Sequence, residues 1–227
     1  MFGPDPIDIF DPSPYGALAY YGHYLIGTVV LIAALVAFAA RKGRGLHRIA
    51  GLIYLGGVFL LGLTSISMLA DRMIPPLAMA VITSFYAVGG AYLALQKESR
   101  LVRALEIGLS LILLLALTGF LVAAIPVVRE GLIPPYAPFV IAIIPGILLV
   151  GDALWHLKQR ERNKRRVARH LSRMIWGFVV VLRAPLVEIA AAGAPIPPPV
   201  VIFGPILLAL AMLAYFLPRF SRATSQA

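Results

Sequence analysis

Residues 101–127 read LVRALEIGLSLILLLALTGFLVAAIPV, and this stretch decides the fold class of the chain. From Ile107 to Val127 it carries no charged side chain. A helix rises about 1.5 Å per residue, so this run spans about 30 Å, which is the thickness of the hydrocarbon core of a bilayer. The stretch therefore predicts a transmembrane helix.

Similar apolar runs occur along most of the chain. The predicted spans are residues 17–40, 47–70, 74–96, 101–127, 137–157, 171–192 and 199–217. The composition agrees, because 60% of the residues are hydrophobic, 13% are charged and the mean hydropathy is +0.90, whereas about 25% of residues are charged in soluble domains. We expect an all-α, polytopic membrane helix bundle of about seven transmembrane helices. Residues 17–217 would form the membrane domain, between an external segment at 1–16 and a cytoplasmic tail at 218–227.

The basic residues indicate the orientation of the chain. Seventeen of the twenty lie beside one alternating set of span ends, whereas Arg72 and Arg129 lie beside the other set. Cytoplasmic loops are enriched in Lys and Arg, so the N-terminus is predicted outside and the C-terminus inside a bacterial inner membrane. The net charge of +10 then reflects topology and attraction to anionic inner-leaflet lipids rather than nucleic-acid binding. The absence of cysteine from the sequence excludes disulfides and thiolate metal sites.

Function is sought in the few polar residues that hydrocarbon penalises. His23 lies in the outer half of the first predicted span, whereas His47, His156 and His170 lie at cytoplasmic span ends. Trp155 and Trp176 near the same face are interpreted as part of an aromatic belt.

Helical spacing favours a haem b site at the cytoplasmic end. Glycine follows His47 by four residues and His170 by seven, and an axial ligand beside bare backbone suits a flat macrocycle. Basic side chains nearby can hold propionates. The predicted cofactor-binding residues are His47, His156, His170, Gly51, Gly177, Arg48 and Arg173.

Two further groups of polar residues carry alternative hypotheses. Asp152 stands one turn before His156, where it can orient the imidazole; a metal site would use His47, His156, His170 and Asp152. Arg183, Pro185 and Glu188 lie in the outer half of the sixth predicted span and mark a candidate transport or proton site, and His23 is a further polar residue within a predicted span.

A resemblance to a known family rests on the N-terminal third of the chain. His23 is followed by the basic turn Arg41-Lys42-Gly43 and by the motif LHRIAGLIY at 46–54, and RHLSRM occurs at 169–174. These segments resemble a family of bacterial predicted multi-pass membrane proteins of unknown function, which carry a first-span histidine and a His-Arg-x-x-Gly-x-x-Tyr pattern. The resemblance implies a multi-helix membrane fold and brings no established reaction.

Four functional hypotheses follow from these residues. The first is a non-enzymatic integral membrane protein that serves as an accessory or assembly subunit of a larger membrane complex. The second is a haem b electron-transfer protein, the third a small-molecule or proton-coupled transporter, and the fourth a metal-dependent hydrolase. Familiar catalytic motifs are missing from the sequence, so enzyme activity is not expected.

Overall fold

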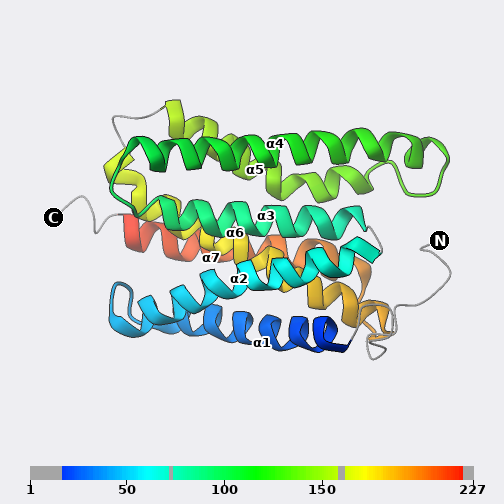
Figure 1. Ribbon diagram of the computed structural model, residues 1–227, viewed down its shortest axis with the longest axis horizontal. Coiled ribbons are helices and arrows are strands. Elements are labelled where there is room, and N and C mark those ends of the chain that lie inside the picture. Colours follow the sequence, from blue (N-terminus) through cyan, green and yellow to red (C-terminus); the bar gives the residue numbers. More distant parts are fainter. Residues whose placement is uncertain (1–16, 72–73, 158–161, 222–227) are drawn as a thin grey trace.

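The described residues of the computed structural model, 17–71, 74–157 and 162–221, form seven helices and no strand. The predicted all-α fold class is confirmed (Figure 1). The helices are α1 (Ala17–Ala39), α2 (Gly45–Asp71), α3 (Pro75–Leu93), α4 (Arg100–Arg129), α5 (Ala137–Leu157), α6 (Arg162–Ala191) and α7 (Pro198–Ser221).

Six of these helices are long and apolar enough to cross a membrane, and α6 is not among them. Helix α6 carries charged side chains along its length and begins at Arg162, nine residues before the predicted span at 171. Helix α7 continues through residues 218–221, which the sequence assigned to the tail. The predicted external segment at 1–16 lies outside the described residues.

Successive helices run in opposite directions along the long axis of the molecule (Figure 1). The connections at 40–44 and 94–99 lie at one end together with the end of α7, and those at 130–136 and 192–197 lie at the other. Helices α4 and α5 form one side of the bundle, α1 and α2 form the opposite side, and α3 and α6 lie between them. The closest helix pairs are α1 with α2, α6 with α7, and α3 with α6.

Local sequence signals set several helix ends. The Ser99 hydroxyl accepts a hydrogen bond from the Val102 amide at 3.1 Å and caps α4. Gly131 follows α4 with a φ of 71°, and the Leu132 amide reaches the Val127 carbonyl at 3.1 Å, which is the pattern of a Schellman turn. The Arg166 guanidinium of α6 donates to carbonyls just after the end of α3, including that of Ala94 at 3.0 Å. This bond holds the start of α6 beside the end of α3.

Small residues allow α3 and α6 to pack closely at the centre of the bundle. Ala87 and Ala91 of α3 are fully buried, as are Ile175 and Val179 of α6. A Cβ atom added to Gly177 would lie 2.8 Å from a methyl carbon of Val88. The backbone of α6 therefore touches α3 directly at this point.

Close packing between α2 and α3 generates a stability prediction. A Cβ atom on Gly62 would lie 2.0 Å from the Phe85 ring, which stacks on Phe59 at 4.9 Å and so has little room to move. We expect Gly62→Ala to lower the free energy of unfolding by about 1–3 kcal/mol, the usual cost of overpacking. Gly56→Ala on the same helix is the matched control, because nothing lies within 4 Å of its added Cβ. Thermal melting in detergent measures both, and equal melting temperatures for the two variants would contradict the packing argument.

Candidate functional site

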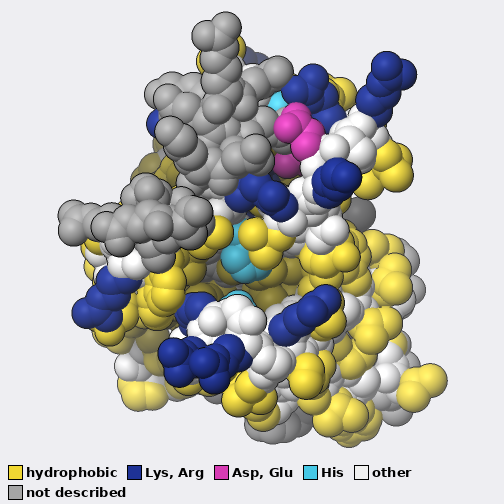
Figure 2. Space-filling model, turned by 90° about the vertical axis from the view of Figure 1, so that its left-hand side faces the viewer, with side chains coloured by type: hydrophobic (Ala, Val, Ile, Leu, Met, Phe, Trp, Pro, Cys, Tyr) yellow, Lys and Arg dark blue, Asp and Glu magenta, His cyan; other side chains and the backbone are white. Residues whose placement is uncertain are grey.

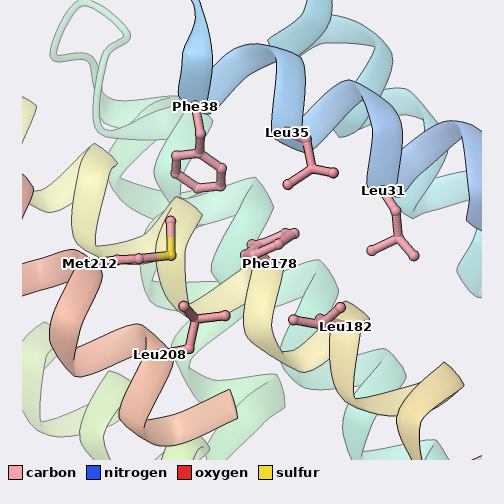
Figure 3. Close-up of a pocket in the computed structure, with 7 residues that line it drawn as sticks. All are labelled: Leu31, Leu35, Phe38, Phe178, Leu182, Leu208 and Met212. Atoms are coloured by element: carbon pink, nitrogen blue, oxygen red, sulfur yellow. The ribbon is translucent and has the colours of Figure 1, made fainter. Parts of the chain in front are cut away.

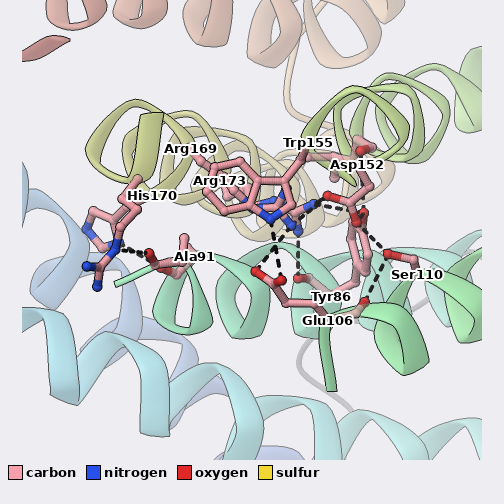
Figure 4. A network of polar contacts seen from close by, with 12 residues as sticks. Tyr86, Ala91, Glu106, Ser110, Asp152, Trp155, Arg169, His170 and Arg173 are labelled. Carbon is pink, nitrogen blue, oxygen red and sulfur yellow. Dashed lines mark hydrogen bonds and ion pairs between the residues drawn. The ribbon is translucent and has the colours of Figure 1, made fainter. Parts of the chain in front are cut away.

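Asp152 of α5 is the centre of a buried polar network (Figure 4). Its Oδ1 forms ion pairs with Arg173 and, at 2.7 Å, with Arg169, both from α6. Its Oδ2 accepts from the Tyr86 hydroxyl of α3 and lies 2.5 Å from the Ser110 hydroxyl of α4. Both oxygens of this carboxylate are therefore occupied by protein groups.

A second carboxylate extends the network towards α4. Glu106 is 2% exposed, and its Oε1 lies 3.8 Å from Arg169 Nη2. Its Oε2 accepts from the indole nitrogen of Trp155 at 3.4 Å. The Arg169 guanidinium also lies over the Trp155 ring, 4.3 Å from its centroid. The network thus pairs two guanidinium groups with two carboxylates, so its formal charge sums to zero.

The backbone of α3 makes room for one of these arginines. The Arg173 Nη2 donates to the Tyr86 hydroxyl at 2.9 Å, and its guanidinium lies 4.6 Å from the centroid of that ring. A Cβ atom on Gly90 would lie 2.2 Å from Arg173 Nη1. Glycine at position 90 therefore lets the guanidinium cross α3 to reach Asp152. Four helices, α3 to α6, are joined by this network.

Histidines lie at the end of the molecule that also carries most of the basic side chains. Figure 2 shows them in a hollow between Lys and Arg side chains. The Nδ1 of His47 lies 2.9 Å from the Ala37 carbonyl of α1, and that of His170 lies 3.0 Å from the Ala91 carbonyl of α3. A carbonyl only accepts, so both rings donate from Nδ1 and leave an Nε2 lone pair when neutral.

Glycine and tyrosine near these histidines differ in what they contact. Nothing lies within 4 Å of a Cβ added to Gly51, so the space beside this residue of α2 is open. Gly177 instead packs against Val88, and the same added Cβ lies 3.5 Å from the Tyr54 hydroxyl of α2. That hydroxyl is buried without a hydrogen-bond partner in the described part of the chain.

Asp152 and Arg173 contact each other rather than the histidines to which the sequence analysis assigns them. Asp152 contacts Arg169, Arg173, Tyr86 and Ser110 instead of orienting His156, because guanidinium groups from α6 reach the carboxylate. Arg173 is committed to that network and does not join the histidines as a propionate partner.

The four-residue metal arrangement is not assembled in the part of the chain that the structure describes. There, no three His, Asp or Glu side chains lie together in a way that could hold a metal ion. Asp152 is surrounded by cations, which compete directly with a metal. Of the remaining predicted residues, Arg48 is exposed at the basic end and His156 is half-buried near the end of α5.

The outer polar residues fall into separate pairs. The Nδ1 of His23 lies 3.0 Å from the Thr64 hydroxyl of α2. Glu188 accepts from the Tyr24 hydroxyl at 2.9 Å, which links α6 to α1. Arg183 is half-buried and forms no hydrogen bond or ion pair with any described residue. The structure therefore does not join Arg183 and Glu188 by a direct bond.

Sequence reasoning missed several members of the ionic network. Tyr86 and Ser110 were not singled out, and Trp155 was assigned to an aromatic belt although it is 7% exposed and contacts Glu106. A signal was available: Glu106 lies six residues from the start of α4 and Asp152 five residues from the end of α5, so the two acids share one depth in antiparallel helices. Arg169 and Arg173, one turn apart on α6, are the matching cations.

Charge balance in the network generates a double-mutant prediction. We expect Asp152→Leu and Arg173→Met each to destabilise the protein by about 3–5 kcal/mol, because each leaves a buried charge uncompensated. The double variant removes one charge of each sign and should be more stable than either single variant. The free energies of unfolding of the wild type, the single variants and the double variant are measured in detergent, with the fluorescence of the buried tryptophans as the signal. Additive losses in the double variant would show that the two side chains are not coupled.

Searches of protein-family models, curated proteins and solved structures find nothing that matches this chain.

Proposed function

We propose that this chain is a non-enzymatic integral protein of the bacterial inner membrane that serves as an accessory or assembly subunit of a larger membrane complex. The closed ionic network is the observation that carries the non-enzymatic part of the proposal. Asp152 is matched by two guanidinium groups and hydrogen-bonded at both oxygens, which leaves it no lone pair directed at a substrate. A catalytic acid or base needs contact with a reacting group. Such a network instead fixes the relative positions of α3, α4, α5 and α6.

An accessory subunit needs a surface for its partner, and the outer face of α5 offers one. A shallow apolar groove of about 490 Å³ runs along it, and its lining includes Ala142 and Gly146, which are one turn apart, together with Ile143 and Ile147. Nothing lies within 4 Å of a Cβ added to Gly146. Small residues at this spacing allow a second transmembrane helix to approach the backbone closely.

Purification from the native membrane in mild detergent tests the proposal. We expect the wild-type chain to co-purify in fixed ratio with another membrane protein, and Gly146→Leu to abolish that association by filling the groove. Gly151→Leu is the matched control, since it lies on the same helix outside the groove and its added Cβ also meets nothing within 4 Å. The proposal fails if the wild-type chain is always isolated alone, or if both variants retain the same partner.

The orientation with the N-terminus outside is part of the same proposal, and α6 then makes the seventh crossing. The end of the bundle that holds the 40–44 and 94–99 connections also holds Arg41, Arg44, Lys97 and Arg100, which favours this end for the cytoplasm. A reporter that is active only outside the inner membrane is expected to be inactive after residue 98 and active after residue 193. The opposite pattern would reverse the orientation.

A haem b electron-transfer protein is the second candidate, supported by the tautomers of His47 and His170. A metal-ligating histidine usually donates its other ring nitrogen to a carbonyl or carboxylate, as both of these do. They lie on α2 and α6, and Gly51 is open next to His47. The unpartnered Tyr54 hydroxyl lies deeper between the same two helices. Haem would supply one-electron redox chemistry, and the two imidazoles would hold its iron.

An absorption spectrum decides this second candidate. After expression with added haem, the purified protein is expected to show a Soret band, and reduction by dithionite should sharpen its α and β bands. His170→Ala should remove the spectrum, whereas His23→Ala at the far end should keep it. A colourless wild-type protein would eliminate haem binding.

A further inference from the structure

An apolar groove lies between α1 and the helices α6 and α7, lined by side chains from all three (Figure 3). It has a volume of about 360 Å³ and no polar lining. Six of the side chains that line it are Leu35, Phe38, Phe178, Leu182, Leu208 and Met212. Its size is within the range of sites that hold small ligands, about 300–1,000 Å³, and its walls match a hydrocarbon chain.

A cation lies beside Phe38, at one end of this groove. The Lys42 ammonium lies 5.8 Å from the centroid of the Phe38 ring and 5.3 Å from that of Phe216, which is one turn beyond Met212 on α7. It donates to the Ala37 carbonyl at 2.9 Å and the Phe38 carbonyl at 2.7 Å. An ammonium group has three donors, so one hydrogen remains for a ligand.

Other positive charge surrounds the same end of the groove. Arg41 and Arg44 are exposed in the turn that contains Lys42. On α7, the Arg219 guanidinium lies 3.6 Å from the centroid of the Tyr215 ring. No carboxylate contacts Lys42 in the described part of the chain. The groove thus joins an apolar slot to a cationic rim, as basic pockets between transmembrane helices do when they bind anionic lipid headgroups.

We infer that the groove between α1, α6 and α7 binds one acyl chain of an anionic phospholipid, whose headgroup phosphate contacts Lys42. The order of the lining residues is consistent with this occupant. Leu35 and Phe38 lie along the last two turns of α1, so an acyl chain that starts at Lys42 passes Phe38 first and continues towards Leu35 and Leu182. The site is independent of the ionic network and of the α5 groove.

Brominated lipids test the inference on the full-length chain in phosphatidylcholine vesicles. Leu35→Trp places a fluorescent reporter in the groove, and Leu115→Trp places one on the lipid-facing side of α4, where residue 115 is 72% exposed. The native Trp155 and Trp176 are buried, and the quenching of wild-type protein supplies their baseline. Brominated phosphatidylglycerol and brominated phosphatidylcholine are compared at the same mole fraction.

The expected result is a preference for phosphatidylglycerol at Leu35→Trp of about five-fold, the effect of one basic side chain near a membrane surface. Leu115→Trp should show none. Adding Lys42→Gln should remove the preference, whereas Lys42→Arg and the loop control Arg44→Gln should keep it. Melting temperatures check that each variant is folded.

Three results would overturn the inference. Equal quenching by the two lipids at Leu35→Trp would mean that the groove is ordinary lipid-facing surface. An absence of quenching by both would mean that protein, such as a second copy of the chain, covers the groove. A loss of preference in Arg44→Gln as large as that in Lys42→Gln would assign the effect to diffuse surface charge.

Discussion

The bundle depends on a requirement that hydrocarbon imposes: the Asp152 carboxylate must be neutralised inside the protein. Arg169 and Arg173 meet it from a different helix, and Glu106 balances the second arginine. Removing one partner from a buried ion pair costs several kcal/mol, because the remaining charge is left uncompensated. The stability of each of these four charged side chains in the interior therefore depends on the other three. The position of α6 against α3, α4 and α5 follows from this requirement. Glycine at position 90, where a side chain would collide with Arg173, follows from it as well.

The same network explains why α6 is less apolar than the other six helices of the described chain. A transmembrane helix must be apolar only where it faces lipid. Helix α6 is buried almost continuously from Ile175 to Val181, and its charged side chains near the basic end are directed at other helices. By contrast, α4 is mostly exposed, with four buried residues in the described chain, and its sequence is correspondingly apolar. The position of α6 against α3 and α5 thus accounts for the two buried arginines that it carries.

The sequence was sufficient for the helices and insufficient for their contacts. Hydropathy over about 20 residues locates a span because the bilayer sets its length, and the predicted starts of α1 and α5 agree with the structure. Contacts between helices depend on the rotation of each helix, which hydropathy does not report. The sequence therefore predicts that Asp152 orients His156, one turn away on its own helix. In the structure Asp152 instead pairs with Arg169 and Arg173 of the next helix, α6. Trp155 and Trp176 were expected at the membrane interface for the same reason and are buried instead.

The basic residues of this fold have two physically different roles. Arg169 and Arg173 have planar guanidinium groups that reach several protein groups at once, and both are buried against Asp152. Lys42 is a point charge on a flexible stem, bound only to two carbonyl oxygens at the end of α1, and it keeps a donor for the membrane surface. The Asp152 carboxylate has no lone pair left for a ligand. The recognition sites that we propose therefore lie at the periphery: the rim around Lys42, the histidine hollow and the outer face of α5. Such a division suits a protein whose core serves to hold its surfaces in place.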